Sequence, residues 1–207
     1  MAEKRSDFKW TAIVLAAGSS TRMGRSKQLL KIASETLIRR TVKTAIDSGA
    51  NETLVVLGAD SEQIKNELSD LSVYTVTNPE FEKGMGSSLK CGVRYVMKKN
   101  SDAEAVMILV SDQPLLNSFY LKKIIEEYLK TKSPIVASFY SERYGVPALF
   151  NKSMFGKLLA IEDQHGAKKC IEQNSTLVKS IDFPEGAVDL DTPEDLKEFK
   201  NLRLPLT

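Results

Sequence analysis

The sequence has little of several residue types that common chemistries require. Its 207 residues include one histidine and two cysteines, Cys91 and Cys170, which lie far apart and form no CxxC pair. This excludes His-rich metal sites, zinc clusters and a disulfide framework, and it weakens any Ser-His-Asp mechanism. The formal net charge is only +2, from 29 basic and 27 acidic residues, which excludes the broad positive field of a general nucleic-acid binder.

Long apolar runs are missing as well. No stretch approaches the roughly 18 consecutive apolar residues of a membrane helix, and the polar residues 1–9 do not resemble a signal peptide. We therefore expect a cytoplasmic protein that binds neither membranes nor nucleic acids. With 42% apolar and 27% charged residues, the chain can bury an ordinary core, and its length suits a single domain over residues 1–207.

Short apolar runs alternate with longer amphipathic segments along the chain. Strands are predicted at residues 11–17, 52–57, 73–77, 105–110, 135–139, 148–150 and 177–181, with a further extended piece at 187–190. Helices are predicted at residues 36–45, 61–68, 87–98, 118–130, 154–161 and 167–173, and from Pro193 onward. Ser61 and Thr192 are candidate N-caps. This alternation is typical of a Rossmann-like, three-layer α/β/α sandwich with a mostly parallel sheet.

The loop after the first predicted strand is the first candidate site, because α/β sheets bind ligands beyond the carboxyl ends of their strands. It reads LAAGSSTRMGRSK over residues 15–27. Its glycines allow tight turns whose N–H groups can cradle phosphate oxygens, and Arg22, Arg25 and Lys27 add cationic donors. The loop is neither a Walker loop nor GxGxxG. The alternative is a solvated basic turn without a ligand.

Three aspartates are candidate metal ligands. Asp112 follows an apolar predicted strand, a position where a hard carboxylate suits Mg²⁺, and its alternative role is an Asx turn or a helix cap. Asp189 and Asp191 point to the same face if their stretch is extended, although Asp191 has the alternative of capping the helix that begins at Pro193. Acidic residues opposite a basic loop fit metal-assisted chemistry on a phosphate-bearing ligand.

The placement of charge along the chain agrees with this hypothesis. Seven basic residues and one acid lie between Arg22 and Lys43, and four acids without a base lie between Asp189 and Asp195. The near-neutral total therefore conceals a basic segment for phosphates and an acidic segment for a metal.

An ordered series of motifs resembles the molybdenum cofactor nucleotidyltransferases, the cytidylyltransferases and guanylyltransferases that make molybdopterin dinucleotides. The motifs are LAAGSSTRMGRSK at 15–27, VVLGAD at 55–60, NPEFEKGMGSSL at 78–89, SDQP at 111–114, GVPALF at 145–150 and DLDTPEDL at 189–196. The resemblance covers nearly the whole chain. It implies a fold of the nucleotide-diphospho-sugar transferase type. It also implies a Mg²⁺-dependent enzyme that moves a nucleoside monophosphate to the phosphate of molybdopterin and releases pyrophosphate.

The resemblance also implies roles for particular residues. The catalytic residues would be Arg22, Lys27, Asp112 and Asp191, with Asp112 and Asp191 as Mg²⁺ ligands. The nucleotide contacts would be Leu15, Ala16, Ala17, Gly18, Ser19, Gly58, Gly84, Ser87 and Ser88. The segment 84–88 has the alternative role of a glycine turn that leads into an N-capped helix. His165 is expected in a surface loop or, as the alternative, against the acceptor.

The resemblance favours CTP as the nucleotide, because Ala17 stands where guanylyltransferases usually have glycine and its methyl group would narrow the base pocket. The implied acceptor is molybdopterin carrying molybdenum, and a molybdoenzyme would receive the product. Val146 stands where the family commonly has histidine, and Ser111 where it often has glycine. The alternatives are guanylyl transfer to the same cofactor, a sugar- or polyol-phosphate nucleotidyltransferase, and a molybdopterin-binding chaperone without turnover.

Overall fold

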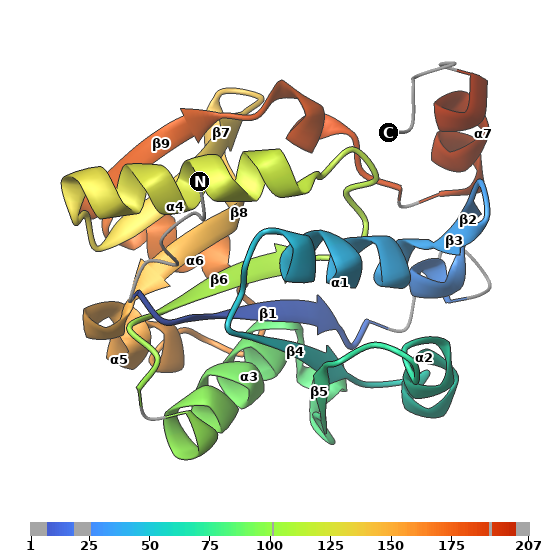
Figure 1. The fold of residues 1–207 in the computed structure, drawn as a ribbon, viewed down its shortest axis with the longest axis horizontal. Helices are drawn as coiled ribbons and strands as arrows, with labels where there is room; N and C mark the ends of the chain where they lie inside the picture. The colour runs from blue at the N-terminus through green and yellow to red at the C-terminus, as the bar shows by residue number, and fades with distance from the viewer. Residues whose placement is uncertain (1–7, 19–25, 101, 191, 202–207) are drawn as a thin grey trace, which may run out of the picture.

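The computed structural model describes residues 8–18, 26–100, 102–190 and 192–201. They form a seven-stranded mixed sheet in the order β5-β4-β1-β6-β8-β7-β9 (Figure 1). The strands are β1 (Trp10–Ala16), β4 (Glu52–Leu57), β5 (Tyr74–Thr77), β6 (Ala105–Val110), β7 (Ile135–Tyr140), β8 (Arg143–Asn151) and β9 (Val178–Asp182). β8 runs antiparallel to both of its neighbours, β6 and β7, whereas the other strand pairs of this sheet are parallel.

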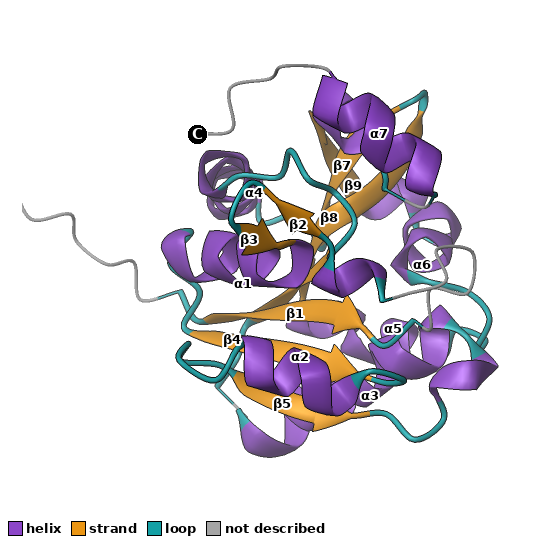
Figure 2. Cartoon of the chain, turned by 90° about the vertical axis from the view of Figure 1, so that its right-hand side faces the viewer, coloured by secondary structure: helices purple, strands orange, loops and turns teal. Residues whose placement is uncertain are grey.

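Helices cover both faces of the sheet (Figures 1 and 2). One face packs against α1 (Leu37–Asp47), α2 (Ser61–Glu67) and α4 (Ser118–Thr131). The other packs against α3 (Met85–Lys99), α5 (Phe155–Leu159) and α6 (Ala167–Gln173). The predicted three-layer α/β/α sandwich with a mostly parallel sheet is therefore confirmed.

β1 lies in the middle of the sheet, between β4 and β6, and every residue of it is buried. Successive side chains of a strand point to opposite faces, so Val14 and Ala16 join one core cluster and Ile13 and Leu15 join the other. A strand buried on both faces needs a continuous apolar run rather than an alternating one. Full burial of a Val, Leu or Ile side chain contributes about 1.5–3 kcal/mol, so β1 fixes the centre of the sheet.

A short hairpin of β2 (Lys31–Ile32) and β3 (Glu35–Thr36) lies outside the main sheet. α7 (Pro193–Asn201) lies beside this hairpin, at the right of Figure 1. A separate apolar cluster joins them, made of Leu30, Ile32, Leu37, Leu190, Leu196 and Phe199. This cluster links the segment after the first loop to the end of the described chain.

Thr192 is the cap of α7, as predicted. Its hydroxyl accepts a hydrogen bond from the backbone N–H of Asp195 at 3.2 Å, and the Asp195 carboxylate accepts one from the N–H of Thr192 at 2.8 Å. This reciprocal pair is a capping box, which satisfies backbone donors that the first turn of a helix leaves open.

Two predicted features are wrong. Residues 187–190 form no strand, because a 3₁₀ helix occupies Pro184–Ala187 and Leu190 is buried in the hairpin cluster instead. Ser61 is not the N-cap of α2, because the carbonyl of Asp60 already accepts the first helical hydrogen bond, from Ile64 at 3.0 Å. The hairpin of β2 and β3 was not predicted, and β8 begins at Arg143 rather than at residue 148.

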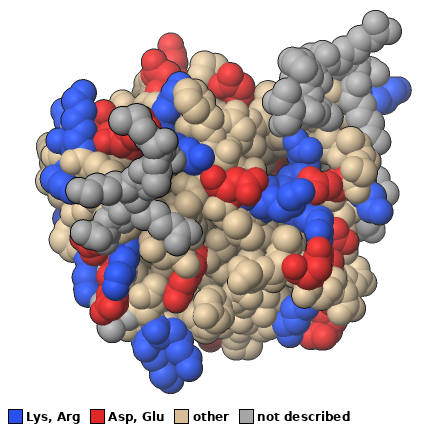
Figure 3. All heavy atoms as spheres, viewed as in Figure 1, with Lys and Arg blue, Asp and Glu red and all other residues tan. Residues whose placement is uncertain are grey.

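Within the described part of the chain, no helix is both long and apolar enough to span a bilayer. Acidic and basic side chains are interspersed over the face drawn in Figure 3. That face therefore carries no large field of one sign.

Candidate active site

A cavity of about 400 Å³ lies at the carboxyl ends of β1 and β6. These two parallel strands are neighbours, so their ends meet at the edge where α/β sheets bind ligands. The lining comes from separate stretches of the chain: Leu15, Ala17, Gly18, Lys27, Gln28, Phe81, Glu82, Gly84, Met85, Ser88, Val110, Ser111 and Asp112. The first loop, the segment 81–88 and the SDQP motif are thus brought together.

Lys27 and Asp112 form an ion pair in this cavity. The Lys27 Nζ lies 2.6 Å from Asp112 Oδ2, and the two side chains are only 20% and 18% exposed. Asp112 Oδ1 is buried and has no hydrogen-bond partner among the described residues, so Asp112 forms no Asx turn with them. A buried acceptor left unsatisfied costs about 1–3 kcal/mol, so this oxygen contributes nothing to the stability of the described part of the chain.

The acidic segment near the end of the chain approaches Asp112 through the backbone. The N–H of Leu190 donates a hydrogen bond to the carbonyl of Asp112 at 3.1 Å. Asp189 precedes Leu190 in the sequence, so this hydrogen bond brings the backbone beside Asp189 close to Asp112. Asp191, the second predicted Mg²⁺ ligand, lies outside the described residues, and the described residues alone contain no group of three or more His, Cys, Asp or Glu side chains that could hold a metal.

Gln28 is a cavity residue that the sequence argument missed. Its side chain is buried, its Nε2 donates to the carbonyl of Gly18 at 3.0 Å, and its Oε1 accepts from the hydroxyl of Ser26 at 2.8 Å. Gln28 therefore holds the end of β1 against the segment that carries Lys27. The sequence offered one sign of this role: Gln28 is a polar residue between Lys27 and the apolar pair Leu29–Leu30.

The predicted nucleotide contacts divide into three groups. Five of them line the cavity: Leu15, Ala17, Gly18, Gly84 and Ser88. Ser19 lies outside the described residues, as do the predicted phosphate ligand Arg22 and its neighbour Arg25. The remaining three, Ala16, Gly58 and Ser87, lie within the described residues but do not line this cavity.

Ala16 and Gly58 pack next to residues of the cavity without lining it. Ala16 packs in the core, because strand alternation turns it away from the face that Leu15 presents. A Cβ atom at Gly58 would lie 2.3 Å from the carbonyl oxygen of Ala17, so only glycine lets the end of β4 approach the end of β1 this closely. Their predicted contact with the nucleotide stays a prediction.

The segment 84–88 has its polar groups engaged within the chain. The N–H groups of Gly86 and Ser87 donate to the carbonyl of Asp163 at 2.8 and 3.3 Å. The amide of Asn78 donates to the hydroxyls of Ser87 and Ser88 at 2.9 and 3.0 Å. The first-turn amides of Gly86 and Ser87 are therefore engaged by a backbone carbonyl and not by a capping side chain. Gly84 and Ser88 line the cavity.

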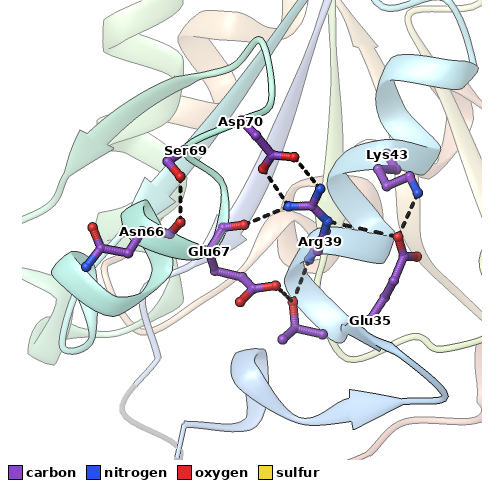
Figure 4. Close-up of polar contacts among 8 residues, drawn as sticks. Glu35, Arg39, Lys43, Asn66, Glu67, Ser69 and Asp70 are labelled. Carbon is purple, nitrogen blue, oxygen red and sulfur yellow. Dashed lines mark hydrogen bonds and ion pairs between the residues drawn. The ribbon is translucent and has the colours of Figure 1, made fainter.

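The basic segment contributes less to the cavity than its charge count suggested. Arg39 lies on α1 and forms a bidentate pair with Asp70, at 2.7 and 2.6 Å, while Lys43 pairs with Glu35 at 2.6 Å (Figure 4). The hydrogen bonds from Arg39 lower the pKa of Asp70 to about 2. The interpretation of the whole stretch as a phosphate site is therefore wrong for Arg39 and Lys43, which connect α1 to neighbouring segments.

His165 lies in a surface turn, as the first of its two predicted roles requires. Its side chain is 43% exposed, and its Nδ1 lies 3.4 Å from a carboxylate oxygen of Glu162. It does not line the cavity.

Residues 12–177 match the model of the MobA-like NTP transferase domain. The chain belongs to this family. It is accordingly a nucleotidyltransferase, and the fold predicted from the motif series is the fold of the family. The same residues hold the cavity and the Lys27–Asp112 pair.

Individual relatives agree with this membership. The chain is 28% identical over 205 residues to the purine catabolism protein PucB of Bacillus subtilis, covering 88% of this chain and 92% of that protein. It is 26% identical over 165 residues to the bifunctional protein GlmU of Clostridioides difficile, where the match covers 77% of this chain but only 34% of GlmU. This chain therefore spans about a third of the length of GlmU.

A solved structure shares the fold. Rv0371c of Mycobacterium tuberculosis superposes with a TM-score of 0.79 at 24% identity, over 92% of this chain and 96% of that one. Rv0371c has also been solved as a complex with manganese.

Proposed function

We propose that this nucleotidyltransferase uses CTP and Mg²⁺ to transfer CMP to the terminal phosphate of molybdopterin carrying molybdenum, with release of pyrophosphate. The observation that carries the proposal is the Lys27–Asp112 pair in a cavity of about 400 Å³ at the carboxyl edge of the sheet, where the buried Asp112 Oδ1 has no partner among the residues that the structure describes. One group there suits phosphate oxygens, and the other suits a hard divalent cation.

Asp112 is suited to be one ligand of Mg²⁺. Asp112 Oδ1 is a carboxylate oxygen, the ligand type that Mg²⁺ prefers, and it is buried without a partner among the described residues. Asp112 would hold the cation together with Asp191, the ligand that the motif series implies. A bound Mg²⁺ would neutralise charge on the phosphates of the nucleotide and the acceptor.

The protein's part in the reaction is to position phosphates and neutralise charge. An oxygen of the acceptor phosphate forms the new bond to the α-phosphorus of CTP, and the bond from that phosphorus to the β-phosphate oxygen breaks. The attacking oxygen is already anionic, so no side chain has to remove a proton. Lys27 would donate to the departing phosphates, since an ammonium group forms strong charge-assisted hydrogen bonds with phosphate oxygens.

Ala17 supports the choice of CTP. It lines the cavity, and the packing of Gly58 against its carbonyl fixes its place. The motif resemblance implies that the base lies beside this position, where a methyl group would narrow the pocket and favour a pyrimidine over a purine.

The test is pyrophosphate release with Mg²⁺, molybdopterin and each nucleoside triphosphate in turn. The proposal expects release with CTP above the other nucleotides, and its loss in the Asp112→Asn variant. Release with a sugar phosphate or polyol phosphate as the better acceptor would assign a different substrate. Stoichiometric binding of molybdopterin without release from any nucleotide would indicate a chaperone and overturn the proposal.

A further inference from the structure

Gln113 lies directly after Asp112, yet its side chain does not line the cavity. The residue is only 3% exposed. Its Nε2 donates to the carbonyls of Val146 and Gly186, at 3.1 and 3.2 Å, and to the hydroxyl of Tyr140 at 3.3 Å. One buried amide thus connects the turn after β6 to β7, β8 and the 3₁₀ helix Pro184–Ala187.

The segment 186–190 is held against this turn at both ends. The carbonyl of Gly186 accepts from Gln113, and the N–H of Leu190 donates to the carbonyl of Asp112. Asp189 lies between these two attachments. The position of the acidic segment relative to Asp112 is therefore set by the neighbouring residue, Gln113, as well as by Asp112 itself.

The oxygen atom of the Gln113 side chain argues against a purely stabilising role. Gln113 Oε1 is buried and has no hydrogen-bond partner among the described residues. An unsatisfied buried acceptor lowers the free energy of unfolding. A glutamine at this position is therefore not explained by stability alone. Departures from full satisfaction of buried polar groups are typical of functional sites.

We propose that Gln113 is a positioning residue for nucleotidyl transfer, which fixes the segment 186–190 and the β8 carbonyl of Val146 relative to Asp112. The inference rests on the proposed function for its chemistry, and on the hydrogen bonds above for its geometry. Gln113 acts through Asp112 and the acidic segment and does not touch the nucleotide cavity. It should therefore affect turnover and metal binding more than nucleotide binding.

The variant that tests this is Gln113→Met, which keeps the length of the side chain and removes its donors. We expect kcat to fall by about ten- to a hundredfold, the loss that misplacement by about 1 Å produces, while the KM for CTP is unchanged. Mn²⁺ binding, followed by electron paramagnetic resonance, should weaken. The backbone amide of Leu190 should exchange its hydrogen faster. Gln113→Asn, whose shorter amide cannot reach all three acceptors, should change the same quantities in the same direction.

The matched control is Tyr120→Phe. The Tyr120 hydroxyl is also buried in this half of the sheet and bonds to Ser138 and to the carbonyl of Ile181, at 2.9 and 3.1 Å, whereas the hydrogen bonds of Gln113 go to Tyr140, Val146 and Gly186. Its loss should lower the melting temperature with no change in kcat, Mn²⁺ binding or Leu190 exchange. A melting temperature lowered in both variants would then not explain an effect seen only in Gln113→Met.

The outcomes separate this inference from the proposed function. If Gln113→Met retains the wild-type kcat and the wild-type protection of Leu190, Gln113 is only a packing residue and the inference is wrong. If the wild-type protein releases no pyrophosphate from any nucleotide, the proposed function fails, and the exchange rate of Leu190 still decides whether Gln113 holds the segment.

Discussion

At the residue scale, the ammonium group of Lys27 and the carboxylate of Asp112 form an ion pair at 2.6 Å. The proposed reaction gives each of these two groups a different ligand. Phosphates would take over the ammonium group of Lys27, and a cation would take over the carboxylate of Asp112. This exchange leads to opposite predictions for the two residues.

Asp112→Asn should reduce kcat at least about a hundredfold, the scale on which removal of one electrostatic contact to the transition state acts. Mn²⁺ binding should be lost as well, because the amide is a far weaker ligand than the carboxylate. The fold should be retained, since asparagine has nearly the volume of aspartate and the change removes no core volume. Turnover near the wild-type rate in this variant would mean that the metal ligand is assigned wrongly.

Lys27→Met should weaken CTP binding about tenfold or more, the typical loss of a charge-assisted hydrogen bond. In the absence of nucleotide the same variant should bind Mn²⁺ more tightly than the wild type, because the cation no longer competes with the ammonium group for Asp112. Isothermal titration with CTP and with Mn²⁺ separately measures both effects. Weaker binding of both ligands would show that the pair does not exchange partners.

At the scale of elements, the apolar runs located most strands and helices because burial on both faces leaves a continuous signal. The hairpin of β2 and β3 escaped prediction because Ala33, with a φ of 54°, carries a left-handed conformation that usually marks glycine or asparagine. The start of β8 was missed for the same reason, since Ser141 and Glu142 turn the chain with φ values of 49° and 58°.

The candidate site was predictable where the residues themselves carry the chemistry. Lys27 and Asp112 are a cation and a carboxylate that follow apolar strands, and the structure brings them together. Gln28 and Gln113 escaped because their roles depend on backbone carbonyls from distant segments, and a sequence gives no direct sign of such tertiary contacts.

α7 should be needed for the site although it lies outside the main sheet. Leu196 is buried in the cluster with Ile32 and Leu190, and truncation of a buried leucine costs about 2–5 kcal/mol. In Leu196→Ala we expect this loss to appear as undocking of α7, with faster hydrogen exchange over 192–201 and a lower kcat. If hydrogen exchange over residues 192–201 is the same as in the wild type, the capping box and the rest of the cluster are enough to hold α7 without Leu196.

The contact between α1 and the segment after α2 should depend on pH. Arg39 lowers the pKa of Asp70 from 3.8 to about 2, so the ionised carboxylate is favoured in the folded state. Its contribution to stability is present above the unfolded pKa of 3.8 and is lost as the pH falls through the folded pKa of about 2. The melting temperature of Asp70→Asn should therefore lie below that of the wild type at pH 7, and the difference should shrink steadily as the pH is lowered from about 4 to about 2. A difference that stays constant over this range would assign it to packing.

At the scale of the whole molecule, the sheet order brings distant segments to one edge. β1 and β6 are neighbours in the sheet, although one spans residues 10–16 and the other residues 105–110. The first loop and the SDQP motif therefore meet in one cavity. The hairpin cluster then joins the segment 186–190 and α7 to the same edge. Of the six motifs in the series, those at 15–27, 78–89 and 111–114 contribute residues to this cavity.

Nucleotidyl transfer at this edge of the sheet is tested by following CTP labelled at the α-phosphorus. We expect the label to move to molybdopterin with release of one pyrophosphate per label. Chelation of divalent cations should stop the transfer, and Asp112→Asn should abolish it. Recovery of all the label as unreacted nucleotide, with CTP and with every other labelled nucleoside triphosphate, would show that the protein does not transfer nucleotides.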